Sequence, residues 1–155
     1  MAGQIFHVGL TVSNLDRSIR FYRDVLGLHF LGEIRMEGRE TEEIFQRQHC
    51  RARVAYLNGS DHPQMPPLEL IQFLDDEPER QPASLFRTSV SEVCFYTDQA
   101  EKAYEDLRKQ GVECLSEPQM FDFTGDGFGR SKAFYFKDPD GIILEMMEPL
   151  SDQEG

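Results

Sequence analysis

The sequence contains no tryptophan and only three cysteines among its 155 residues. Cys50, Cys94 and Cys114 are odd in number and show no CxxC spacing. The sequence therefore indicates neither a disulfide framework nor a zinc site built from thiolates. We expect a reducing, cytoplasmic environment.

Basic residues are also scarce, because 16 Lys and Arg stand against 28 Asp and Glu, which gives a formal net charge of −12. Such a chain repels the phosphates of nucleic acids and the headgroups of an anionic membrane. No apolar stretch is long enough to span a bilayer, and the first residues lack the basic segment and apolar run of a signal peptide. We expect neither nucleic acid nor a membrane as a partner.

The first part of the chain predicts a strand, a helix and three more strands. In residues 4–12, apolar and polar positions alternate, which places His7 on the less apolar face of a strand. Asn14 is a typical N-cap for a helix that starts at about Leu15, and Gly27 closes that helix. Three further strands are predicted at residues 28–34, 52–59 and 68–74, and the charged stretch 35–50 contains a candidate for a short helix or lid.

The same pattern begins again after the polar, proline-containing residues 75–88, which we interpret as a linker. The segment SEVCFYTD resembles FHVGLTVS, and Asp98 takes the place of Asn14 ahead of a second helix that Gly111 closes. A strand at 112–121, a Gly-rich turn at 125–130 and a hairpin around Asp-Pro-Asp-Gly complete it. The predicted division is a first module (1–74), a linker (75–88), a second module (89–148) and an acidic tail (149–155).

Four polar residues in apolar strands fall on two repeated positions. Glu145 interrupts an apolar strand, where a carboxylate needs a cation or a proton. Superposing the halves places Glu92 on His7, and aligning LELIQ with LEMME places Glu69 on Glu145. We expect the four side chains to converge on one point between the modules.

One imidazole and three carboxylates suit a divalent cation, since a cation relieves the repulsion between carboxylates. By ligand type, Mn, Fe, Co, Ni, Zn or Mg is favoured over Cu(I). His29, His49 and His62 lie in charged or polar segments, where we expect them to be solvated.

With these residues in view, the chain resembles the vicinal oxygen chelate superfamily, which includes glyoxalase I, methylmalonyl-CoA epimerase, extradiol dioxygenases and bleomycin-resistance proteins. The resemblance is carried by residues 7–28, the strands 53–57 and 68–73, and residues 133–145. It implies an α+β fold in which two paired βαβββ modules form a cupped, barrel-like mixed sheet with helices outside.

The resemblance also implies a metal site and a reaction. The positions that match the superfamily's ligands are His7, Glu69, Glu92 and Glu145, and the ion would be Zn, Ni, Co, Mn or Fe. Glu145 or Glu69 would act as the base in a lyase or isomerase of the glyoxalase I or methylmalonyl-CoA epimerase type, on a small substrate with vicinal oxygens. Glu92 stands where metal enzymes of this kind usually carry His, so it is an unusual ligand, a base, or a sign that metal binding is lost.

Two other functions remain open. An extradiol dioxygenase would use iron, and Tyr135 stands where those enzymes keep a catalytic Tyr. A drug-binding protein of the bleomycin-resistance type would need no metal. Thr11 and Phe73 occupy places where glyoxalase I carries Arg and Asn, which argues against glutathione as the substrate.

Strand parity and loop position predict the residues that contact the substrate. The superfamily also leads us to expect a homodimer. The predicted substrate contacts are Phe73, Tyr96, Phe128, Arg130, Tyr135 and Met147.

Overall fold

The structure, a computed structural model, describes residues 2–59 and 67–151. His62, most of the loop at 60–67 and the end of the acidic tail therefore lie outside the described residues. The chain divides into two compact units, residues 1–80 and 81–155. Within the described parts of the chain, no helix is long and apolar enough to cross a membrane.

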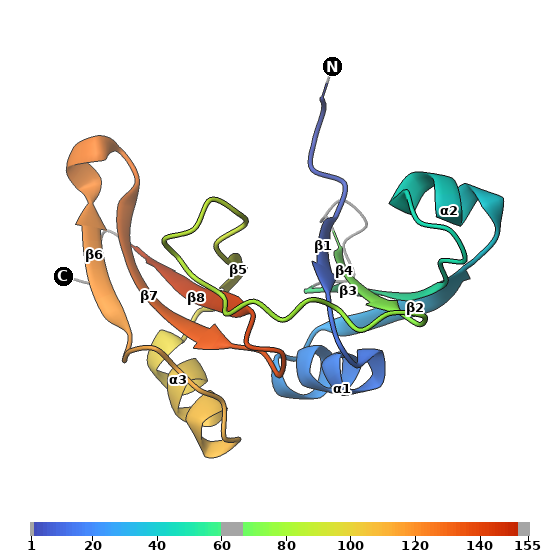
Figure 1. Cartoon of the computed structure of the whole chain (residues 1–155). Coiled ribbons are helices and arrows are strands. Elements are labelled where there is room, and N and C mark those ends of the chain that lie inside the picture. Colours follow the sequence, from blue (N-terminus) through green and yellow to red (C-terminus); the bar gives the residue numbers. More distant parts are fainter. Residues whose placement is uncertain (1, 60–66, 152–155) are drawn as a thin grey trace. The chain divides into compact units, whose positions relative to one another are not determined.

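The first unit contains one four-stranded mixed sheet in the order β1-β4-β3-β2, in which only the β1–β4 pair is parallel (Figure 1). Helix α1 lies on one face of this sheet and α2 on the other. The elements are β1 (Val8–Thr11), α1 (Leu15–Arg20), the π-helical turn η1 (Phe21–Val25), β2 (His29–Met36), α2 (Arg39–Phe45), β3 (Ala52–Asn58) and β4 (Leu68–Phe73).

The helical segment formed by α1 and η1 begins and ends as the sequence predicts. The Asn14 side chain accepts a hydrogen bond from the backbone N–H of Arg17 at 2.9 Å, which satisfies a donor of the first turn. Gly27 follows the helical segment with a φ of 77°, a conformation that glycine adopts without steric cost. Of the apolar residues that recur at helical spacing in this segment, Leu15, Ile19 and Tyr22 are buried and Leu26 is half-buried.

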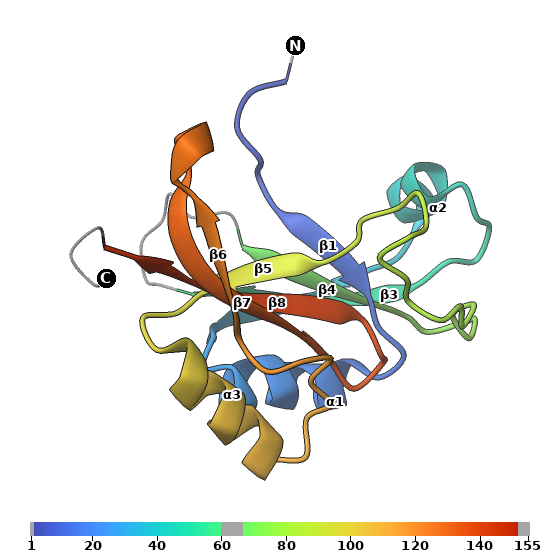
Figure 2. The same ribbon diagram turned by 90° about the vertical axis from the view of Figure 1, so that its left-hand side faces the viewer.

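The second unit repeats this arrangement, with the sheet order β5-β8-β7-β6 and a parallel β5–β8 pair. Helix α3 lies across one face of the sheet (Figure 2), and its Tyr104 packs edge-on against Phe134 of β7. The elements are β5 (Val93–Tyr96), α3 (Ala100–Lys109), β6 (Gln119–Phe123), the 3-10 turn η2 (Thr124–Asp126), β7 (Gly129–Lys137) and β8 (Ile143–Leu150). The α+β class and the repeated βαβββ module are thus confirmed.

Helices α1 and α3 each donate a backbone hydrogen bond to a side chain on the last strand of their unit. Gln72 Oε1 accepts from the backbone N–H of Leu15 at 2.8 Å, and Glu148 Oε2 accepts from that of Ala100 at 2.8 Å. Helix α3 has Gln99 at its N-cap, one residue later than the predicted Asp98, and Gln99 makes no side-chain capping bond. Glu148 therefore accepts a hydrogen bond from the start of α3, a role that Asn14 and Gln72 share at the start of α1.

Two sequence-based boundaries in the second unit were wrong. The strand predicted at 112–121 is confined to Gln119–Phe123, apart from an isolated bridge between Cys114 and Phe136. Pro118 has no backbone N–H to donate, so regular pairing starts after it. The end of the Gly-rich turn predicted at 125–130 belongs to β7, which begins at Gly129.

The turn between β7 and β8 is confirmed. The Asp138 carboxylate accepts hydrogen bonds from the backbone N–H groups of Asp140 at 2.8 Å and Ile142 at 2.9 Å. Gly141 has a φ of 82°, which the turn requires. This turn fixes the register in which β8 presents Glu145 opposite Tyr135.

Candidate functional site

In the first unit, Glu69 lies on the central strand β4 between two very different neighbours. It is paired with Gly9 on β1 and with Tyr56 on β3. A Cβ atom added at Gly9 would lie 3.4 Å from Glu69 Oε1, so the carboxylate occupies the space that a side chain would otherwise fill. Because side chains alternate along a strand, Glu69 faces away from Leu70 and from α1.

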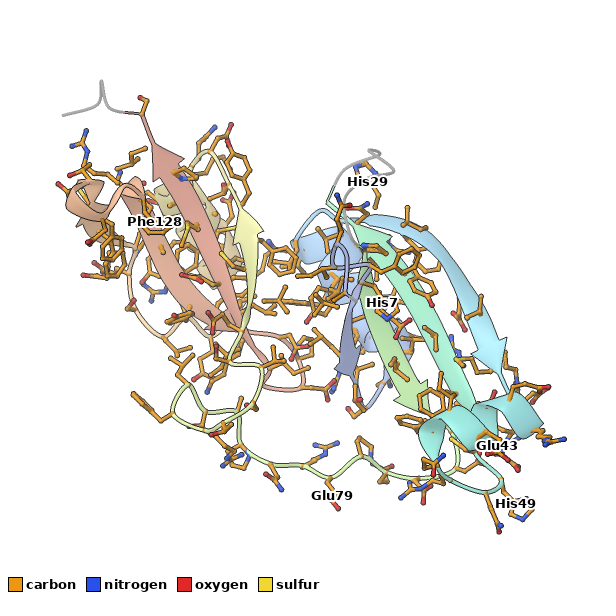
Figure 3. All side chains as sticks on the ribbon, turned by 90° about the horizontal axis from the view of Figure 1, so that it is seen from above. His7, His29, Glu43, His49, Glu79 and Phe128 are labelled. Atoms are coloured by element: carbon orange, nitrogen blue, oxygen red, sulfur yellow. The ribbon has the colours of Figure 1, made fainter. Side chains whose placement is uncertain are left out.

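His7 stands one residue before β1 and faces the same carboxylate. Its Nε2 atom lies 3.7 Å from Glu69 Oε1, beyond the range of a hydrogen bond. The His7 side chain is 39% exposed and that of Glu69 is 12% exposed, so a small molecule or ion can reach the pair from the histidine side. His49 lies beside the end of α2, well away from His7 (Figure 3).

Tyr56 completes this group. Its hydroxyl donates a hydrogen bond to the Glu69 carboxylate, and this bond, together with burial and the negative charge of Glu69, raises the pKa of Tyr56 to about 12. The Tyr56 ring also meets the His7 ring edge-on, with centroids 6.4 Å apart. Glu69 is therefore held by a hydrogen bond on one side and a close steric contact on the other.

In the second unit, Glu145 occupies the equivalent position on the central strand β8. It is paired with Cys94 on β5 and with Tyr135 on β7. Burial raises the pKa of Glu145, the hydrogen bond with the Cys94 thiol lowers it in part, and the nearby Glu92 carboxylate raises it further. Glu145 thus holds a proton more tightly than an exposed glutamate does.

Two neighbours of Glu145, Cys94 and Tyr135, are themselves kept neutral. Although Cys94 is an exposed residue as a whole, desolvation of its thiol and the carboxylates of Glu145 and Glu92 raise the pKa of Cys94 to about 12. Burial, followed by the charge of Glu145, raises the pKa of Tyr135. Glu92, one residue before β5, accepts a hydrogen bond from the Ser91 hydroxyl. The second group therefore has two carboxylates and no imidazole.

The donor atoms of both groups suit a divalent ion. With metal–ligand bonds of about 2.1 Å, neighbouring ligand atoms lie about 3.0 Å apart in an octahedral site and about 3.4 Å apart in a tetrahedral one. The 3.7 Å between His7 Nε2 and Glu69 Oε1 is close to these separations. In the second unit, Glu92 and Glu145 bring two carboxylates near each other, and a cation would relieve their repulsion.

Each unit taken by itself supplies only part of a ligand set. Within residues 2–59 and 67–151, no group of three or more His, Cys, Asp or Glu side chains is arranged to hold a metal ion. The convergence of His7, Glu69, Glu92 and Glu145 on one point therefore stays a prediction.

Comparison with known proteins agrees with this repeated geometry. The family model described as "Glyoxalase/Bleomycin resistance protein/Dioxygenase superfamily" matches residues 4–146, nearly the whole chain. The chain belongs to this superfamily. The resemblance that the sequence motifs indicate is therefore confirmed.

Relatives within the superfamily match over almost their full length. Lactoylglutathione lyase of Haemophilus influenzae is 29% identical over 154 residues, which cover 98% of this chain and 97% of that protein. The uncharacterized protein YwkD of Bacillus subtilis is 30% identical over 145 residues, which cover 93% of this chain and 95% of that protein.

Solved structures of the superfamily share the fold. A glyoxalase family protein of Bacillus cereus aligns with a TM-score of 0.81 and 19% identity over 97% of both chains. The trypanothione-dependent glyoxalase I of Leishmania major aligns with a TM-score of 0.67 and 20% identity, covering 95% of this chain and 87% of that one. At these identities the likeness shows the fold alone.

The predicted substrate contacts fall into three groups. Three of them lie on the same face of the sheet as Glu145. Tyr135 pairs directly with Glu145, and the Tyr96–Met147 pair lies two residues further along β5 and β8 than the Cys94–Glu145 pair, so side-chain alternation returns it to that face. Phe73 is on the face of Glu69, where it packs edge-on against Phe45 of α2 with ring centroids 5.1 Å apart.

Phe128 and Arg130 are placed differently. Phe128 is 86% exposed next to η2, in the connection between β6 and β7 (Figure 3). Arg130 is an even-numbered position of β7, so strand alternation places it with Phe134 on the face that α3 covers. Arg130 is therefore on the face of the sheet opposite to Tyr135 and Glu145.

Sequence reasoning missed three residues of these groups, Gly9, Tyr56 and Cys94. The repeat contains a signal for two of them, since the offset that places Glu92 on His7 also places Cys94 on Gly9. Tyr56 is found only from the register of the β3–β4 pair, which sets it opposite Glu69 just as Tyr135 is set opposite Glu145.

Proposed function

We propose that the chain is a cytoplasmic, metal-dependent lyase or isomerase that moves a proton at a carbon next to a carbonyl group. The observation that carries this proposal is that two glutamates at equivalent positions of the two sheets have different surroundings. Glu69 is held by Tyr56 beside an imidazole, whereas burial and, to a smaller extent, the Glu92 carboxylate raise the pKa of Glu145. Such a pair supplies one fixed ligand and one base.

The roles follow from these surroundings. His7 and Glu69 would hold the divalent ion, which when bound supplies a Lewis acid for a carbonyl and a vicinal oxygen of the substrate. Zn, Ni, Co, Mn and Fe all suit an imidazole and carboxylate donor set. Glu145 accepts the proton, because a carboxylate with a raised pKa is a stronger base than an exposed one. The Cys94 thiol orients Glu145 by hydrogen bonding.

The substrate class is a small molecule with vicinal oxygens, of the kind that the Haemophilus influenzae lactoylglutathione lyase and the epimerases of the superfamily handle. The proposed substrate does not contain glutathione. Phe73 packs against Phe45 at a place where glyoxalase I carries an amide, and Thr11 is found where it carries a cation.

The first experiment is elemental analysis of the protein purified without chelator and after reconstitution with each metal. The substitution His7→Ala should abolish metal loading while leaving the fold intact. His49→Asn is the matched control, because Asn tolerates the φ of 55° at that position and His49 lies away from His7. Retention of one metal per chain by the His7→Ala variant refutes the assigned ligand.

Activity is then measured on the reconstituted protein. The hemithioacetal of methylglyoxal tests the lyase reaction, and a chiral 2-methyl acyl-CoA tests the epimerase reaction. No metal uptake after reconstitution would favour the alternative of a drug-binding protein that needs no metal.

One observation favours a second enzymatic candidate. Tyr135 lies directly opposite Glu145, which agrees with the place of the catalytic Tyr in extradiol dioxygenases. Oxygen uptake by the Fe(II)-loaded protein on catechol tests this reaction. We expect none, since Glu92 takes the place of the second His.

We also propose a homodimer. The edge strand β6 exposes Phe121 and Phe123, whose stacked rings lie 5.8 Å apart, on a surface that a second copy could cover. Light scattering at several protein concentrations measures the oligomeric state.

A further inference from the structure

Tyr56 makes the only hydrogen bond to Glu69 that we find among the described residues. The bond crosses from β3 to β4 between two directly paired residues, so the backbone register holds its two ends together. The ring is steadied as well, because it meets His7 edge-on. The hydroxyl is thus a fixed donor.

The opposite side of Glu69 is closed by backbone rather than by a side chain. At Gly9, a Cβ atom would lie 3.4 Å from Glu69 Oε1 and 3.7 Å from Ile71 Cδ1. The carboxylate therefore lies over the glycine, in a space that fits it closely. With Tyr56 on one strand and Gly9 on the other, the carboxylate is confined in the direction across the sheet.

We propose that Tyr56 is a positioning residue that, together with Gly9, fixes Glu69 in the orientation in which it binds the metal. This inference rests on the proposed function and adds a determinant of metal affinity to it. A free glutamate side chain loses rotamer freedom when it becomes a ligand, and a carboxylate that is already oriented loses less. Hydrogen-bond partners of metal ligands typically change metal affinity by about 10- to 100-fold.

The second unit provides the comparison that isolates this effect. Tyr135 occupies the register position of Tyr56, but the hydrogen bond that acts on Glu145 comes from the Cys94 thiol. Tyr56→Phe and Tyr135→Phe each remove one hydroxyl from equivalent strands. Only the first removes the donor to a proposed ligand.

The experiment measures the dissociation constant of Zn²⁺ by competition with a chromophoric chelator, in the full-length protein and its variants. Tyr56→Phe should weaken Zn²⁺ binding by about 10- to 100-fold, and Tyr135→Phe by less than about threefold. The visible spectrum of the Co²⁺-loaded protein should change in Tyr56→Phe, which a purely structural loss would not produce. Thermal unfolding without metal checks that both variants fold.

Two more variants make the test specific. Gly9→Ala introduces a methyl group 3.4 Å from Oε1 and should weaken Zn²⁺ binding by about threefold while Tyr56 stays intact. In a Glu69→Gln background, Tyr56→Phe should have no further effect, because the hydroxyl acts through Glu69.

The outcomes separate the two proposals. Equal dissociation constants for the wild type and Tyr56→Phe, or an undiminished effect of Tyr56→Phe in the Glu69→Gln background, would overturn the positioning role and leave the metal site standing. If the wild type binds no metal after reconstitution, both proposals fail.

Discussion

The two units of the chain share one backbone plan and differ in the chemistry placed on it. Strand order, strand directions and the pairing of each central glutamate are the same in both. Yet Glu69 has a glycine, a tyrosine hydroxyl and a histidine around it, whereas Glu145 has a thiol, a tyrosine and another carboxylate. Equivalent backbone positions thus give one constrained carboxylate and one with a raised pKa.

The difference teaches that the register of a sheet decides where a functional group stands, while its neighbours decide what it can do. A β-strand pair places partner side chains at a constant separation whatever their identity. The proton affinity of a carboxylate, in contrast, responds to burial, nearby charge and hydrogen bonds. A duplicated fold can therefore divide ligand and base between two copies of one position.

The largest effect is expected from exchanging the two glutamates for glutamine one at a time. Glu145→Gln should lower kcat by about 10²- to 10⁴-fold with the metal retained, because it removes the base. Glu69→Gln should mainly weaken metal binding. Steady-state kinetics beside elemental analysis distinguishes the two, and equal metal loss in both variants would contradict the division of roles.

A smaller effect is expected from making the two units more alike. Glu92→His introduces the imidazole that the first unit has at His7, and should tighten Zn²⁺ or Ni²⁺ binding by about tenfold, since imidazole suits these ions. Glu92→Gln is the control, because it removes the same charge without adding a nitrogen ligand. Unchanged affinity in Glu92→His would mean that this position does not reach the metal.

The helix contacts of the two units should differ in their contribution to stability. Glu148→Ala should lower the free energy of unfolding by about 1 kcal/mol, because the N-cap residue of α3, Gln99, makes no side-chain capping bond. Gln72→Ala should cost less, since Asn14 still caps α1. Urea unfolding measures both, and equal losses would show that Asn14 gives α1 no additional protection.

The smallest effect is a shift in pH dependence. The hydrogen bond from Cys94 lowers the pKa of Glu145, so Cys94→Ala should raise it. A general base works only when deprotonated, and the acidic limb of kcat/KM should therefore move to higher pH in this variant. Cys94→Ser keeps a donor and should leave the limb near its wild-type position; a shift in both variants would point to packing instead of the hydrogen bond.

Much of the fold could be predicted because its signals are local or repeated. Asn14 and Gly27 mark the ends of a helical segment, and the short helix α2 falls within the charged stretch where a helix or lid was expected. The repeat itself fixed which residues are equivalent. The start of β6 was missed because Pro118 interrupts an otherwise strand-like segment.

The surroundings of the site were harder to predict for a physical reason. The Tyr56 bond to Glu69 and the caps supplied by Gln72 and Glu148 join residues that are distant in sequence. No propensity or spacing within one element encodes such a contact. Such a contact can be predicted only when the pairing of two strands is known residue by residue, as it is here for β3 and β4.

The position of β4 and β8 in the middle of their sheets has a consequence for motion. Each is bordered by a strand on both sides, whereas β2 and β6 lie at the edges. Edge strands open in small fluctuations that leave the middle of a sheet closed. The amide hydrogens around Glu69 and Glu145 should therefore exchange with deuterium far more slowly than those of β2 and β6, so that thermal fraying at the rims leaves the proposed ligand and base in place.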